Sequence, residues 1–270
     1  MLDRFRLDVL SLIATIFFVS YTAWWLALQF IFTSDKFQLD LFTVTYGFIA
    51  VWGGLWGIEI ARSWGGFKSA MGKVILFFSF GLLAQELGQL IYTYYIYVLG
   101  VEVPYPSLGD IGYFGSIPLY IIGTIYLAKV AGVRISMRSV LSKFQALVIP
   151  IFILGGAYLV FLQNYTFDWS LPLTIFLDFG YPLGQAIYIS IALLTYFLSR
   201  SLLGGVMKNK ILLILFALLV QFIADFTFLY QASRGEWAIS GINDFIYLAA
   251  YFMMAIGILQ LKSVVKKLQE

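Results

Sequence analysis

Polar residues recur at matching positions in two otherwise apolar stretches of the chain. The run LLAQELGQLIYTYY returns later as LLVQFIADFTFLYQ, which aligns Gln85 with Gln221 and Gln89 with Asp225. Carboxyl and carboxamide groups are costly to place in an apolar environment, so their recurrence in register predicts that they line one shared interface. Such groups can bind a polar or cationic ligand, and paired carboxyls can also act as general acid and general base.

The segments that follow these two runs also correspond, with Asp110 aligned to Asp244 and Tyr113 to Tyr247. Both aspartates stand at the expected start of a helix, where a carboxyl caps free N–H groups. Capping accounts for them, and a ligand-facing rim shared with the two tyrosines is the alternative. Glu86, which we place near mid-membrane, is the deepest carboxyl of the chain. These five residues are the secondary site candidates.

A third polar stripe lies between the two repeated runs. Asp178, Tyr181, Gln185 and Tyr188 follow spacings of three, four and three, which put them on one face of a helix. Inside a membrane such a face should point into the bundle, either as an interhelical hydrogen-bond network or as the wall of a pocket. The resulting candidate ligand-binding residues are Gln89, Asp178, Tyr181, Gln185, Gln221 and Asp225.

Glu86 and Asp225 have no lysine or arginine in the middle of the predicted spans to pair with. We therefore expect these carboxyls to be protonated, hydrated in an outward-open cavity, or bound to a cationic group. The chain also has no histidine and no cysteine. Disulfides and imidazole or thiolate metal ligands are thus excluded, and we expect neither a metal site nor a cofactor.

The composition is that of a membrane protein. With 61% hydrophobic and 11% charged residues and a mean hydropathy of +0.91, the chain cannot be a soluble globule. Several runs exceed the roughly 18 apolar residues that can cross a bilayer. We predict an all-α membrane protein with spans at residues 8–33, 41–62, 73–99, 111–132, 144–163, 172–199, 209–230 and 241–262.

The basic residues indicate how these spans are oriented. All but Lys36 and Arg234 lie at or near the same end of the spans, in the alternate loops and at the two ends of the chain. The positive-inside rule then places both termini in the cytoplasm, as an even number of spans requires. The net charge of +3 reflects this asymmetry, and we expect no nucleic-acid partner.

The repeat unit is four helices long, since the loops correspond along with the spans. A unit with an even number of spans keeps its orientation, so the two halves should be parallel and related by an axis along the membrane normal. We predict a single membrane domain, 1–270, made of a first repeat, 1–133, and a second repeat, 134–270.

Three blocks of this sequence carry a family resemblance: PYPSLGDIGYFGSIPLYIIG, LDFGYPLGQAIYISIALL and LLVQFIADFTFLY. The chain resembles a polytopic membrane sensor region of bacteria and archaea, which usually precedes a diguanylate cyclase, phosphodiesterase or histidine kinase domain. Gln185 stands where the second block of that family has an aspartate. No such output domain follows in this chain, so the resemblance implies a sensor that acts through a cytoplasmic or membrane partner.

We therefore expect a sensory or ligand-binding module of the inner membrane of a prokaryote. Its polar cavity would open to the outer side and take up a small or lipid-like ligand, with membrane lipids as its other partners. One alternative is an intramembrane lipid hydrolase, because the chain is similar to the eight-span lysoplasmalogenases in its helical aspartates. A small-molecule transporter is another. No nucleophile–base arrangement is evident, which favours a role without catalysis.

Overall fold

The computed structural model describes residues 9–133, 139–199 and 207–269, and in these residues the only regular structure is helical. The helices are α1 (Val9–Phe30), α2 (Lys36–Thr45), α3 (Phe48–Ser63), α4 (Ala70–Thr93), α5 (Gly109–Val130), α7 (Val140–Ala157), α8 (Pro172–Ser199), α9 (Lys208–Arg234), α10 (Ile242–Leu259) and α11 (Leu261–Gln269). A short 3-10 turn, Gly66–Lys68, precedes α4, and π-helical turns, Tyr94–Leu99 and Tyr158–Leu162, extend α4 and α7.

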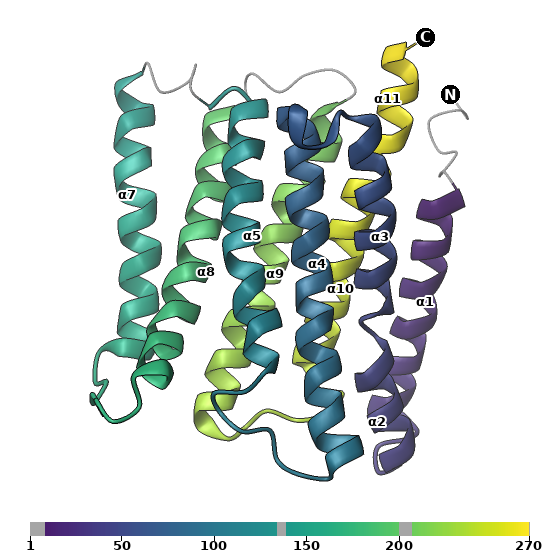
Figure 1. The fold of residues 1–270 in the computed structure, drawn as a ribbon, viewed down its shortest axis with the longest axis vertical. Coiled ribbons are helices and arrows are strands. Elements are labelled where there is room, and N and C mark those ends of the chain that lie inside the picture. Colours follow the sequence, from purple (N-terminus) through teal and green to yellow (C-terminus); the bar gives the residue numbers. More distant parts are fainter. Residues whose placement is uncertain (1–8, 134–138, 200–206, 270) are drawn as a thin grey trace.

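Eight helical segments are long and apolar enough to cross a membrane, which confirms the predicted class and number of spans. Continuous helices satisfy their own backbone hydrogen bonds, as a chain in hydrocarbon must. Side chains mark several beginnings: Asp35 caps α2, Ser69 caps α4 and Ser139 caps α7. Consecutive spans run in opposite directions through the bundle (Figure 1).

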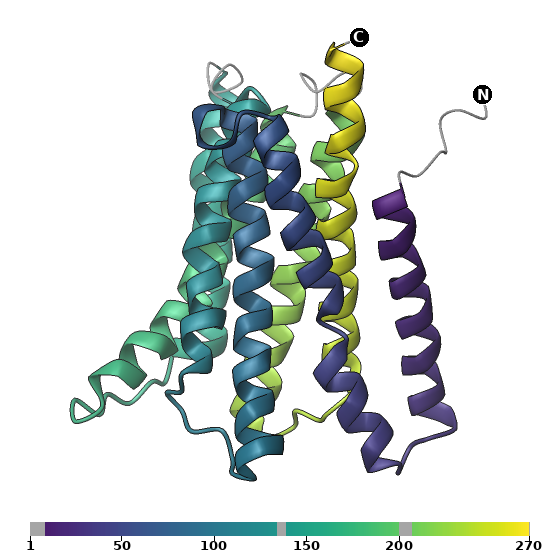
Figure 2. The same ribbon diagram turned by 45° about the vertical axis from the view of Figure 1, so that its right-hand side comes forward.

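The bundle is a closed ring of helices with two helices, α1 and α7, outside it. α4 packs against α3 and α5, while α10 packs against α9 and α3. α8 lies between α5 and α9, which closes the arrangement. α1 flanks α10 on one side, and α7 contacts α8 on the other (Figures 1 and 2). The spans of α4, α8 and α10 have the largest buried shares, and those of α1 and α7 the smallest.

Glycines allow α4 and α5 to pack closely against each other. A Cβ on Gly112 of α5 would lie 2.4 Å from the Gly88 backbone nitrogen and 2.5 Å from the Ala84 carbonyl oxygen of α4. The two backbones therefore touch, as is common where small residues mediate packing in membranes.

The second span differs from its prediction because it is broken. The sequence predicts one helix over 41–62, whereas α2 ends at Thr45 and α3 begins at Phe48. Gly47 stands in the break, and a Cβ there would lie 1.7 Å from Oε2 of Glu86. The glutamate side chain thus occupies the room that a larger residue would need. By contrast, α8 continues through Pro182, although its first turns lean away from the bundle (Figure 2).

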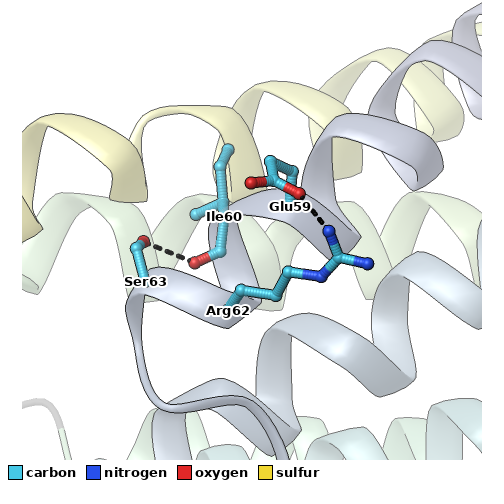
Figure 3. A network of polar contacts seen from close by, with 4 residues as sticks. All are labelled: Glu59, Ile60, Arg62 and Ser63. Atoms are coloured by element: carbon cyan, nitrogen blue, oxygen red, sulfur yellow. Dashed lines mark hydrogen bonds and ion pairs between the residues drawn. The ribbon is translucent and has the colours of Figure 1, made fainter.

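The first visible turn of α1 and the last of α11 lie at one end of the bundle (Figure 1). We refer to it as the predicted inner end, and to the end that carries loops 100–108, 163–171 and 235–241 as the predicted outer end. At the inner end, Glu59 pairs with Arg62 at 2.7 Å on the exposed surface of α3 (Figure 3). Arg4, Arg6, Arg134, Arg138 and Arg200, part of the predicted basic side, lie outside the described residues.

Candidate functional site

Asp225 on α9 is the centre of a buried hydrogen-bond cluster. Its Oδ2 accepts the hydroxyl of Tyr188 from α8 at 2.8 Å, and its Oδ1 accepts the hydroxyl of Tyr247 from α10 at 3.0 Å. Gln221, one turn earlier on α9, donates to the same Oδ1 at 2.9 Å. The carboxyl is 4% exposed. Residues from the predicted α8 stripe and from the repeated runs thus bind the same acid, and their hydrogen bonds join α8, α9 and α10.

A corresponding contact holds Gln89 on α4. The hydroxyl of Tyr113 on α5 donates to its Oε1 at 2.7 Å, just as Tyr247 donates to Asp225. The amide nitrogen of Gln89 donates in turn to the carbonyl of Thr43 at 3.0 Å. Residues aligned in the sequence repeat therefore make the same tyrosine contact in both halves.

Asp110, at the start of α5, combines two roles. Its Oδ2 accepts the backbone N–H of Ser107 at 2.6 Å, which is the expected capping contact. Its Oδ1 accepts the hydroxyl of Tyr181 on α8, also at 2.6 Å. The acid thus fastens the start of α5 to the predicted polar stripe of α8.

Asp244, the repeat partner of Asp110, is also held by a cap and a helix contact. The backbone N–H of Ser240 donates to its Oδ2 at 2.8 Å, and the hydroxyl of Thr43 on α2 donates to the same oxygen at 3.3 Å. Asp244 is 3% exposed. Asp110 on α5 therefore contacts α8, and Asp244 on α10 contacts α2, both at the predicted outer end.

Two predicted residues are buried with unpartnered atoms. Oε1 of Gln185 and both carboxyl oxygens of Glu86 have no hydrogen-bond partner. Gln185 is 4% exposed and Glu86 is 2% exposed. Neither side chain belongs to the hydrogen-bonded groups around Asp225 and Asp110.

Asp178 lies apart from the other candidates, near the predicted outer surface. Its two oxygens accept the hydroxyls of Tyr105 and Tyr165, each at 2.7 Å, from the loops that precede α5 and α8. Donation to this carboxylate raises the pKa of Tyr165 to about 12. Burial, together with the bond to Asp178, raises the pKa of Tyr105 as well. Helical spacing placed Asp178 on the Tyr181 face correctly, but it could not reveal that loop residues satisfy this acid.

A hollow that the sequence did not predict opens next to Tyr165. It has a volume of about 310 Å³ and is lined by Leu159, Val160, Phe161, Gln163, Asn164, Tyr165 and Thr166. A second hollow of about 220 Å³ is mainly apolar and lies where α7 meets α8. Neither is lined by the predicted site residues. In the sequence, the only signal at the first hollow is a common Asn-Tyr-Thr tripeptide, which carries no information about binding.

The described residues contain no group of three or more acidic, histidine or cysteine side chains that could hold a metal ion. The carboxyl groups of Asp110, Asp178, Asp225 and Asp244 are acceptors that already bind tyrosine, threonine or glutamine donors. A ligand with its own donors or a positive charge could compete for these acceptors. Comparison with family models, with curated proteins and with solved structures finds no match for this chain.

Proposed function

We propose that this chain is a sensory or ligand-binding module of a prokaryotic inner membrane, with both termini in the cytoplasm. One observation carries the proposal. Asp110 accepts a hydroxyl from α8, and Asp244 accepts one from α2, so a buried acid bridges the two halves on each side. A ligand that takes either acid away from its partner would release one half from the other, and that movement is the signal.

The helix contacts support an arrangement of two parallel repeats, 1–133 and 134–270. The sequence α3–α4–α5 is packed in order, and so is α8–α9–α10. Between the halves, α3 packs on α10 and α8 packs on α5, which are the same contact with the repeats exchanged. Units with an even number of spans keep their orientation, so the relating axis lies along the membrane normal.

The ligand we propose is small or lipid-like and carries a hydrogen-bond donor or a positive charge. The two bridging acids, Asp110 and Asp244, accept hydrogen bonds from hydroxyl groups. Aromatic rings lie close by, since Tyr92 packs against Tyr113 and Phe114 against Tyr181. Asp178 and the hollow beside Tyr165 lie at the same end and provide the first polar surface that such a ligand meets. We also propose that the module passes its signal to a cytoplasmic or membrane partner.

Native mass spectrometry of the protein, purified in mild detergent, tests this function. We expect a small organic molecule or lipid to remain bound, and its occupancy to fall in Asp110→Asn and Asp225→Asn while the variants stay folded. An amide costs less to bury than a carboxylate, so these changes should preserve the bundle. Glu59→Gln, at the exposed inner surface, is the matched control. Equal occupancy in all four proteins, or a cleaved lipid product, contradicts the proposal, and the latter favours a hydrolase.

One feature favours the transporter alternative: a spanning segment that is interrupted beside a buried acid, at Gly47 and Glu86. Broken helices beside ionisable groups are typical of transporter binding sites. Proteoliposomes loaded with the molecule that co-purifies distinguish the two functions. Uptake that exceeds protein-free liposomes supports transport, whereas binding without flux supports the sensory module.

A further inference from the structure

Among the described glutamates, Glu86 alone is almost completely buried, and it lies within a predicted membrane span. It is 2% exposed, and neither of its oxygens has a hydrogen-bond partner. Asp225 and Asp110 are nearly as deeply buried, yet both accept tyrosine hydroxyls. A negative charge without donors or a cation is strongly disfavoured in such a place. The carboxyl therefore needs a positive partner, or a proton.

The carboxyl is directed at the break between α2 and α3. Oε2 would lie 1.7 Å from a Cβ on Gly47, so the side chain rests directly on the backbone of the break. Gly47 is the N-terminal cap of α3, a helix of 16 residues, and no side chain caps it. The first N–H groups of a helix have no acceptors within it and carry partial positive charge. An ionised Glu86 would have donors within a short movement.

The titratable groups around Glu86 come from the elements packed near it. The side chains in electrostatic contact with Glu86 are tyrosines from α1, from the end of α2, from α5 and from α10: Tyr21, Tyr46, Tyr113 and Tyr251. Asp244 of α10 in turn faces Tyr46 and Tyr113. None of these groups is a base that carries positive charge. The neighbourhood therefore offers hydroxyls and another acid, and no counter-ion.

We propose that Glu86 is a proton-binding site, which holds a proton in the arrangement described here and gives it up when the break opens to water. The O–H bond of the carboxyl breaks, the proton passes to water, and the electron pair stays on the carboxylate. The carboxylate then moves onto the free N–H groups at the start of α3. This site goes beyond the ligand-binding function and does not depend on it.

The neighbouring contacts connect this site to the interface between the two halves. Gln89, one turn along α4, donates to the carbonyl of Thr43 at the end of α2. The hydroxyl of Thr43 binds Asp244 of α10. A shift of α2 or α3 upon deprotonation therefore reaches the contact between α2 and α10. Proton occupancy of Glu86 and the strength of that contact are coupled.

Infrared spectroscopy of the full chain with carboxyl-¹³C glutamate tests the proposal. The C=O stretch of a protonated glutamic acid is distinct from that of a carboxylate, and the label separates it from aspartate. Glu59, Glu102 and Glu236 are exposed to solvent, whereas Glu86 is buried. We expect one labelled protonated band at neutral pH, lost in Glu86→Gln and kept in Glu59→Gln. Absence of the band in the wild type overturns the proposal, and that result needs no variant to fold.

Two further measurements sharpen the result. Raising the pH should remove the band. It should also raise the protection factors of the Phe48 and Ile49 amides, measured against intrinsic exchange at each pH, because the carboxylate is expected to cap α3 there. Replacing potassium with sodium at constant ionic strength should leave the band unchanged. A band that disappears with sodium assigns the site to that ion and overturns the proposal for the proton. Unchanged protection factors at Phe48 and Ile49 overturn the step in which the carboxylate caps α3.

Discussion

At the scale of single residues, tyrosine hydroxyls determine how acids are accommodated in this bundle. Asp225, Asp110 and Asp178 each accept at least one of them, and the donors come from a different helix or loop than the acid. Such a bond joins two elements and at the same time makes the burial of a carboxyl tolerable. The tyrosines are therefore as much a part of the candidate site as the acids.

Replacing Tyr188 with phenylalanine should lower the free energy of unfolding in detergent by about 0.6 to 1.7 kcal/mol, the range for interhelical hydrogen bonds in membranes. The change removes one donor from Asp225 and keeps the ring that packs against Tyr120. Tyr196→Phe, on the same helix and 40% exposed, is the control and should have no effect. In an Asp225→Asn background the cost of Tyr188→Phe should shrink, and an undiminished cost contradicts a bond between the two.

The loop contact at Asp178 should be sensitive to alkaline pH. The pKa of Tyr165 is raised from 10.0 to about 12 because its neutral hydroxyl donates to Asp178. A raised folded-state pKa contributes stability that is complete below about pH 10 and is lost as the pH rises through about 12. Phenolate absorbance should show this late titration in the wild type and an earlier one in Asp178→Asn. Tyr165→Phe identifies the step, and identical curves for wild type and Asp178→Asn contradict the contact.

At the scale of helices, hydropathy and spacing predicted the spans and the shared faces of polar residues, but neither the break before α3 nor the partners of Asp178 and Tyr181. Long apolar runs define the spans within a few residues, because hydropathy alone decides which segments enter the bilayer. The break before α3 was not predicted, and at it Glu86 of another helix lies against Gly47, a contact that hydropathy cannot reveal. Likewise, the shared face of Asp178 and Tyr181 was predictable, but their different partners were not. Spacing gives the direction of a side chain and does not give its neighbours.

The contact between α4 and α5 makes a prediction at this scale. Gly112→Ala should destabilise the protein by about 1–3 kcal/mol, because the added methyl meets backbone atoms of Gly88 and Ala84 that cannot rotate away. Gly115→Ala, three residues along the same helix, has open space around it. It should be neutral or stabilising by up to about 1 kcal/mol. Thermal unfolding in detergent measures both, and equal effects of the two changes contradict the close approach.

At the scale of the whole molecule, the orientation in the membrane can be measured directly. The chain has no cysteine, so single cysteines can be introduced without background. An impermeant thiol reagent added outside intact cells should label Glu102→Cys and should label Lys68→Cys only after permeabilisation. Labelling of Lys68→Cys from outside would reverse the orientation and, with it, the side from which a ligand reaches Asp110 and Asp244.

The first helices of the two predicted repeats are held differently. α1 packs along α10, whereas its predicted counterpart α7 contacts mainly α8, and only 11% of its apolar stretch is buried. Side chains such as Phe152 and Ile151 are 80% and 61% exposed. In a bilayer, acyl chains must solvate this helix on nearly all sides. The length and packing of the lipid acyl chains should therefore affect the tilt of α7 more than the tilt of any other span.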